Sequence, residues 1–165
     1  MSKGFTLMEI LAVMLVIAVI ASFALPAFRS VRSEVYYHQA KTAGIKLAEA
    51  IRSYYRDSKG FLPVLGEISG DTVANQAYTC DRSKLSGIPG QGATVSIEQL
   101  FGCGYLSAKD FAGLPYRFSS GITTSSDYSG PLVRGIGQDS DKAGRYKRKT
   151  FTIARNMAIT EPFDD

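Results

Sequence analysis

The sequence predicts an α+β protein in which a long N-terminal α-helix, transmembrane in its first half, packs against a small antiparallel β-sheet head. An apolar run covers residues 5–28, and an amphipathic helical pattern continues it to about residue 58. Short segments with alternating apolar residues lie in the last third of the chain. The 165 residues, 45% hydrophobic and 21% charged, are enough for one domain with a core.

The apolar run from Phe5 to Phe28 contains a single charged residue, Glu9. About 20 apolar residues cross a bilayer core of about 30 Å, so the run is long enough to span a membrane. A carboxylate costs about 2.5–3.5 kcal/mol at mid-span and somewhat less near the interface, which favours a functional role for Glu9 over a side chain that merely reaches the headgroups. Pro26 lacks a backbone donor and is expected to kink or locally open the helix.

The amphipathic second half of the helix is predicted over residues 29–60, with its end at about Ser58, before Gly60 and Pro63. Its apolar face, with steps of three and four residues, consists of Tyr36, Ala40, Ala43, Leu47, Ile51 and Tyr54. The charged positions between them are expected to be solvated or to face other subunits: Arg29, Arg32, Lys41, Lys46, Glu49 and Arg52.

The head is predicted over residues 61–165. Its first part, to about residue 97, is rich in turn-forming residues and indicates a connector loop, followed by one short helix at 96–101 with Ser96 as its cap. Three or four antiparallel strands are expected, with the strongest signals at residues 116–119, 132–136 and 149–155. An antiparallel sheet of these strands, packed against the long helix, gives a fold of the α+β class.

The residue inventory excludes several kinds of chemistry. The single histidine, His38, excludes multi-histidine metal and catalytic sites, and two cysteines cannot make a four-ligand zinc site. No phosphate-binding Gly-x-x-x-x-Gly-Lys run and no nucleophile–base pair is recognisable. We therefore expect a protein that is not an enzyme and needs no cofactor.

The hexapeptide Gly4-Phe5-Thr6-Leu7-Met8-Glu9, followed by the apolar run and Pro26, resembles the processing motif of type IV prepilins and type II secretion pseudopilins. The resemblance is strong over the helix and covers the head only in outline. It implies a pilin-like fold and a leader, residues 1–4, that a prepilin peptidase removes between Gly4 and Phe5. It also implies N-methylation of Phe5 and pairing of Glu9 with the Phe5 amine of a neighbouring subunit. Such pairing is physically sensible because either charge alone is costly in an apolar environment.

The resemblance also implies where the protein acts and with what. The precursor would lie in the inner membrane, interact with prepilin peptidase and the pilus assembly machinery, and polymerise with copies of itself into an extracellular type IV pilus. A periplasmic type II secretion pseudopilin is the first alternative. A membrane-anchored or secreted periplasmic binding domain is the second, and Glu9 discriminates against it because an ordinary anchor needs no carboxylate.

An exported head would meet oxidising conditions, under which Cys80 and Cys103 are expected to form a disulfide; two reduced thiols are the alternative. On the loop-entropy model a loop of this size contributes about 3 kcal/mol to stability. Such a contribution would matter for a small head.

Two loop segments suggest binding. The segment 137–144 carries Asp139 and Asp141 and is faintly similar to the calcium loop of major pseudopilins, although a solvated turn is favoured because further acidic ligands are missing. The next segment is basic: Arg145, Lys147, Arg148 and Lys149. It is a candidate for binding DNA or anionic surfaces. The alternatives are a solvated strand edge, or pairing with the acidic C-terminus of a neighbour (Glu161, Asp164 and Asp165).

Overall fold

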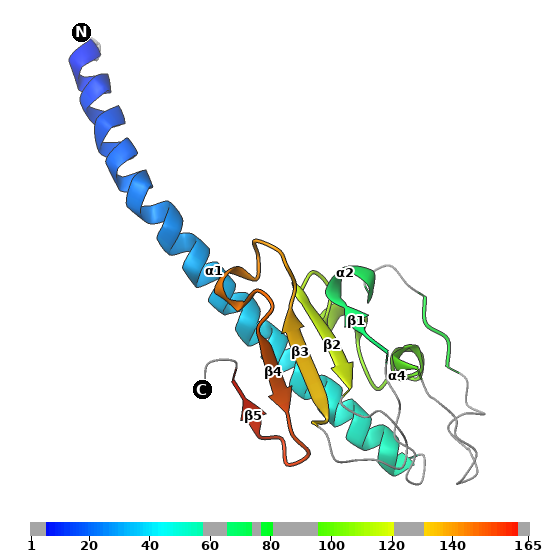
Figure 1. The fold of residues 1–165 in the computed structure, drawn as a ribbon. Helices are drawn as coiled ribbons and strands as arrows, with labels where there is room; N and C mark the ends of the chain where they lie inside the picture. The colour runs from blue at the N-terminus through cyan, green and yellow to red at the C-terminus, as the bar shows by residue number, and fades with distance from the viewer. Residues whose placement is uncertain (1–5, 58–65, 74–76, 81–95, 121–130, 162–165) are drawn as a thin grey trace.

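The computed structural model describes residues 6–57, 66–73, 77–80, 96–120 and 131–161. Helix α1 (Leu7–Asp57) confirms the expected long helix, and in Figure 1 its N-terminal half projects from the head while its second half lies against the sheet. The helix is continuous through Pro26, so the expected local opening is absent from the single chain. A proline at this position deprives only one carbonyl, that of Ser22, of its helical donor.

The head contains a five-stranded antiparallel sheet in the order β1-β2-β3-β4-β5. The strands are β1 (Ile68–Ser69), β2 (Tyr116–Ser120), β3 (Val133–Gly137), β4 (Thr150–Ile153) and β5 (Ile159–Thr160). The three central strands lie where the alternating pattern predicts them. The two edge strands were missed because two residues are too short to carry a period.

Short helices complete the described fold: α2 (Gly70–Val73), α4 (Ile97–Gly102), η1 (Ala108–Asp110) and η2 (Gly144–Tyr146). The expected helix at 96–101 is confirmed as α4; Ser96 occupies its N-cap position, but the Ser96 side chain forms no capping hydrogen bond. The connector was expected to be loop, yet β1 and α2 lie within it. The order of β1 comes from its pairing with β2, which local composition does not reveal.

The buried face of α1 differs by one tyrosine from the predicted face. Tyr37 is 3% exposed, whereas Tyr36 is only partly buried beside the core. The buried row repeats strictly by four and three: Ser33, Tyr37, Ala40, Gly44, Leu47, Ile51 and Tyr54. Starting the row from Tyr36 displaced its first member by about a quarter turn.

Phe151 of β4 fills the contact between α1 and the sheet. It lies opposite Gly135 of β3, where an added Cβ would come within 2.3 Å of the Phe151 ring. A Cβ at Gly44 of α1 would lie 3.1 Å from the same ring and 2.9 Å from Ile153. Two glycines therefore let one aromatic ring join the helix and two strands in a close-packed core.

Candidate functional site: the exposed half of α1 and its junction with the head

The first half of α1 exposes large apolar side chains on every side. An 18-residue window here has a mean hydropathy of 2.7, and none of it is buried, so by length and composition the helix can cross a membrane. The exposed side chains before the head are Leu7, Met8, Ile10, Leu11, Val13, Met14, Leu15, Val16, Ile17, Val19, Ile20, Phe23, Leu25, Phe28 and Val31. A surface of this extent indicates contact with lipid or with other helices.

Glu9 caps the start of its own helix. Its backbone N–H donates to the Thr6 carbonyl at 3.0 Å, and the Thr6 backbone N–H lies 3.4 Å from the carboxylate atom Oε2 of Glu9. The Thr6 hydroxyl completes the pattern, 3.4 Å from the Glu9 nitrogen. This is the capping box that Thr-x-x-Glu encodes, and its signal is present in the sequence alone. In the single chain, the Glu9 carboxylate therefore faces its own helix terminus.

Burial of α1 begins at Ser33, where the loop between β3 and β4 reaches the helix. A Cβ added at Gly144 of η2 would lie 2.6 Å from the Cβ of Ser33, so the loop and the helix touch there. Tyr146 stacks on Tyr37 with ring centroids 4.0 Å apart and donates its hydroxyl to Glu34 at 2.8 Å. These contacts anchor the edge of the head to α1.

Glu34 also accepts a hydrogen bond from Arg145, a member of the predicted basic segment. The Tyr146 hydroxyl and the Glu34 carboxylate together raise the pKa of Arg145. One of the four basic side chains is therefore committed to a carboxylate of its own chain. Sequence analysis missed the role of Glu34 because the two residues are 111 positions apart.

The C-terminal end of the sheet is held to α1 by Glu161. Its carboxylate accepts hydrogen bonds from the Lys41 ammonium and the Tyr37 hydroxyl. Burial acts to raise the pKa of Glu161, but these two donors outweigh it and leave the pKa below its ordinary value. Burial, followed by the hydrogen bond to Glu161, raises the pKa of Tyr37. The sequence left open a pairing of Glu161 with the basic segment of a neighbour; in the single chain Glu161 accepts hydrogen bonds from Lys41 and Tyr37.

Lys46 likewise contacts its own head, with its Nζ 2.6 Å from Asp110 of η1. Lys46 stays exposed, as do the other charged positions predicted to be solvated, and only Lys41 is partly covered by the head. Sequence periodicity shows which side of a helix is polar but not whether another element of the same chain covers part of that side.

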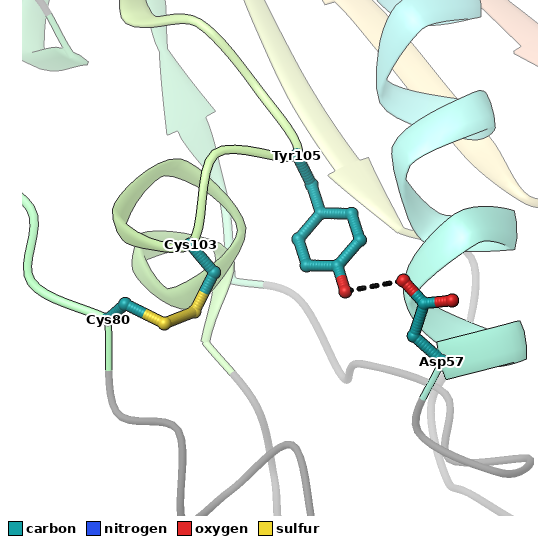
Figure 2. Close-up of a disulfide and its surroundings, with 4 residues drawn as sticks. All are labelled: Asp57, Cys80, Cys103 and Tyr105. Carbon is teal, nitrogen blue, oxygen red and sulfur yellow. Dashed lines mark hydrogen bonds between the residues drawn. A yellow bond between two sulfur atoms is a disulfide. The ribbon is translucent and has the colours of Figure 1, made fainter.

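The expected disulfide joins Cys80 to Cys103, whose Cα atoms are 4.6 Å apart (Figure 2). Tyr105, two residues after Cys103, donates its hydroxyl to Asp57 at 2.7 Å. A carboxylate at a helix C-terminus is disfavoured by the helix dipole, so this donor stabilises the end of α1. Burial and the hydrogen bond to Asp57 raise the pKa of Tyr105 to about 12.

In the segment 137–144, for which a solvated turn was favoured over a calcium site, Asp139 and Asp141 are exposed and contact cations of the protein itself. Arg148 lies 2.6 Å and Lys147 lies 3.3 Å from Asp139, and Lys147 also lies 3.7 Å from Asp141. The hydrogen bonds from Arg148 and Lys147 lower the pKa of Asp139. Among the residues that the structure describes, no three potential ligands gather into a metal-binding group.

The basic segment lies in η2 and the turn that follows it, rather than on a strand edge. Arg148 has a positive φ of 58° in this turn. Its hydrogen bond to Asp139, like that of Arg145 to Glu34, joins the segment to nearby carboxylates and reduces the net charge available to a ligand. Gly4 and Phe5, the predicted processing residues, lie outside the described residues, as do Asp164 and Asp165.

Comparison with known proteins identifies relatives. Two proteins named Type IV major fimbrial protein FimA, one from Dichelobacter nodosus strain VCS1703A and one from Dichelobacter nodosus, are each 27% identical to the chain over 137 residues. The match covers 82% of this chain and 76% of each relative. No protein-family model matches the chain. No solved structure matches it significantly.

The fold and the relatives agree on a class: a helix-anchored α+β subunit similar to structural proteins of fimbriae. The match over most of the chain, together with the long apolar helix, supports a relationship to type IV pilins. This similarity supports a structural subunit that assembles with copies of itself and is anchored in a membrane before assembly.

Proposed function

We propose that the chain is the subunit of an extracellular type IV pilus, cleaved between Gly4 and Phe5 and polymerised through the exposed half of α1. The observation that supports this most directly is the unpartnered apolar surface from Leu7 to Val31. Lipid can cover this surface in the precursor and neighbouring helices can cover it in a filament, so the same residues serve both states. No enzymatic activity is assigned to it.

Glu9 directs assembly in this proposal. In the single chain its carboxylate caps the helix through Thr6, and in the filament it would instead meet the Phe5 amine of a neighbour. Both arrangements place donors around a carboxylate that is costly in an apolar environment. Before assembly, Thr6 supplies the donors to Glu9 within the membrane. In the filament the amine of a neighbouring Phe5 replaces them, and this pairing fixes the register between the two subunits.

The first test is the intact mass and N-terminal residue of the protein in material sheared from cells. We expect a chain that begins at Phe5, heavier by one methyl group and lighter by two hydrogens for the disulfide. A chain that begins at Leu25, or one that still begins at Met1 and occurs only in membranes, would end the proposal and favour a secreted or anchored binding domain.

The second test is Glu9→Leu, with Glu67→Leu as a control that makes the same change at an exposed carboxylate of the head. We expect Glu9→Leu to abolish filaments while the head remains folded, and Glu67→Leu to retain assembly. In an ordinary membrane anchor Glu9→Leu would be silent or would improve insertion. Normal filament yield from Glu9→Leu would therefore exclude the assigned role.

We choose the pilus over a type II secretion pseudopilin because both matched relatives are named as major fimbrial proteins. A pseudopilin whose head depends on calcium would lose stability in a chelator. Because Lys147 and Arg148 already neutralise Asp139, we expect the melting temperature to be the same in chelator and in calcium. A large calcium-dependent rise would favour the pseudopilin.

A further inference from the structure

A hollow lined by cations lies where α1 leaves the head. Its volume is about 620 Å³, within the roughly 300–1,000 Å³ typical of small-ligand sites. Residues from the helix and from the loop between β3 and β4 line it: Arg29, Ser30, Arg32, Ser33, Asp141, Lys142, Gly144 and Arg145. Figure 1 shows this loop, in orange, against α1 at the junction.

The charges around the hollow do not cancel. Four cationic side chains face one carboxylate, that of Asp141, which also lies 3.7 Å from Lys147. Arg145 is paired with Glu34, but within the described part of the chain no ion pair involves Arg29 or Lys142. Arg32 contacts the neutral Tyr36, with its guanidinium 3.3 Å from the hydroxyl. The hollow therefore retains positive charge for an anionic ligand.

The hollow lies at the level of the membrane surface if α1 spans the bilayer. The apolar segment from Leu7 to Phe28 is about 33 Å long at 1.5 Å per residue, close to the roughly 30 Å thickness of a hydrocarbon core. Arg29 and Arg32, about one turn apart, follow immediately and so lie among the headgroups. Lys142 reaches the same level because its loop touches α1 at Ser33.

We propose that this hollow binds the phosphate of an anionic phospholipid in the leaflet facing the head. The inference rests on the membrane-spanning precursor of the proposed function. Arginine suits the role because its planar fork donates two hydrogen bonds to one phosphate. Binding would dock the head on the bilayer before assembly. Phospholipid binding also explains why Arg29 and Arg32 follow the apolar segment on the side of the head, where the positive-inside rule disfavours cations.

A lipid fits the position better than DNA does. The site lies at the base of the head beside the bilayer, where a headgroup is already present and a duplex would have to approach a membrane surface. The basic segment after Arg145 is a separate feature, since Lys147 and Arg148 pair with Asp139.

Lipid retention by the full chain provides the test. The protein, in detergent with an equimolar mixture of phosphatidylglycerol and phosphatidylcholine, is analysed by native mass spectrometry for the lipids it retains. We expect wild type to retain phosphatidylglycerol about tenfold more than phosphatidylcholine, and Arg29→Gln/Arg32→Gln to lose that preference. The double variant Arg52→Gln/Arg134→Gln, which removes the same charge elsewhere on the exposed surface, should keep it.

Lys142→Gln provides an independent variant on the head side of the hollow and should weaken the preference without altering the membrane-spanning helix. Equal preference in the two double variants, or none in wild type, would overturn the inference. Displacement of the lipid by an equal concentration of glycerol phosphate would assign the hollow to a soluble phosphate instead. If the chain inserts into bilayers but shows no preference, only this inference fails; if it does not insert, the proposed function fails too.

Discussion

The two halves of α1 have the same backbone structure but different surroundings. From Leu7 to Arg32 the side chains are exposed apart from a partly covered Ala21, whereas from Ser33 to Tyr54 a strip of the helix is buried against the sheet. Phe23 is 75% exposed and Tyr54 is fully buried. The first half is therefore built for an apolar solvent or for other subunits, and the second half belongs to the core of the head.

The comparison shows that hydrophobicity alone does not define a core. The most apolar segment of the chain is its most exposed, because no other element of the same chain reaches it. The less apolar second half is buried because β3, β4 and η2 pack on it. The first half of α1 therefore serves assembly and the second half stabilises the head, so substitutions in the two halves should have different effects.

The largest effect is expected from Phe151→Ala. Removing a ring that packs between Gly44 and Gly135 leaves a cavity and should destabilise the head by about 3–5 kcal/mol. Phe23→Ala in the exposed half is the matched control and should leave head stability unchanged. Denaturant unfolding of the full chain in detergent measures both, and similar losses in the two variants would contradict the division of α1.

A second large effect is expected from Cys80→Ser/Cys103→Ser. Loss of the cross-link should cost about 3 kcal/mol, since the unfolded chain regains the freedom of a loop with a sequence separation of 23. Unfolding of oxidised wild type and of the variant, each with and without reductant, checks this. Reductant should affect only wild type; equal midpoints for oxidised wild type and variant would rule out a stabilising disulfide.

A smaller, pH-dependent effect is expected at Glu161. Because its pKa is lowered in the folded state, its contribution is complete above the ordinary pKa of 4.5 and is lost as the pH falls through the folded pKa. Glu161→Gln should cost about 1–2 kcal/mol at neutral pH, a figure reduced for partial exposure, and little in acid. Glu67→Gln, which breaks an exposed pair with Arg117, should change stability by under about 1 kcal/mol.

Urea unfolding of Glu161→Gln, Glu67→Gln and wild type across the acid range measures these differences. Hydrogen exchange at β5 should identify where the Glu161 effect acts. An effect of Glu161→Gln that stays constant down to strongly acidic pH would show that the carboxylate is not the stabilising group.

The smallest effect is expected from Tyr105→Phe, which removes the hydroxyl donated to Asp57. The loss should be about 1 kcal/mol at neutral pH. Because folding raises the pKa of Tyr105 from 10.0 to about 12, the contribution is complete below pH 10.0 and disappears as the pH rises toward 12. Stability measured at neutral and alkaline pH checks this; equal stability of wild type and Tyr105→Phe at neutral pH would argue against the bond.

The sequence by itself determined the long helix, its apolar first half, the central strands and the candidate disulfide partners. Each has a local signal: hydrophobic period, span length, alternation, or the presence of two cysteines in an exported head. The Thr6–Glu9 capping box was also readable in this way. The resemblance to type IV prepilins followed from Gly4, Phe5, Glu9 and the adjoining apolar run, because that signal is concentrated at one end of the chain.

Only the tertiary structure decided which charges pair and where burial begins. Lys41 with Glu161 and Arg145 with Glu34 join residues more than a hundred positions apart, and no local pattern encodes such contacts. The edge strands owe their order to their neighbours. Tyr37 rather than Tyr36 entered the core because the sheet approached α1 along the row that begins at Ser33. Long-range packing determines these features, since it selects one face from a helix that offers several.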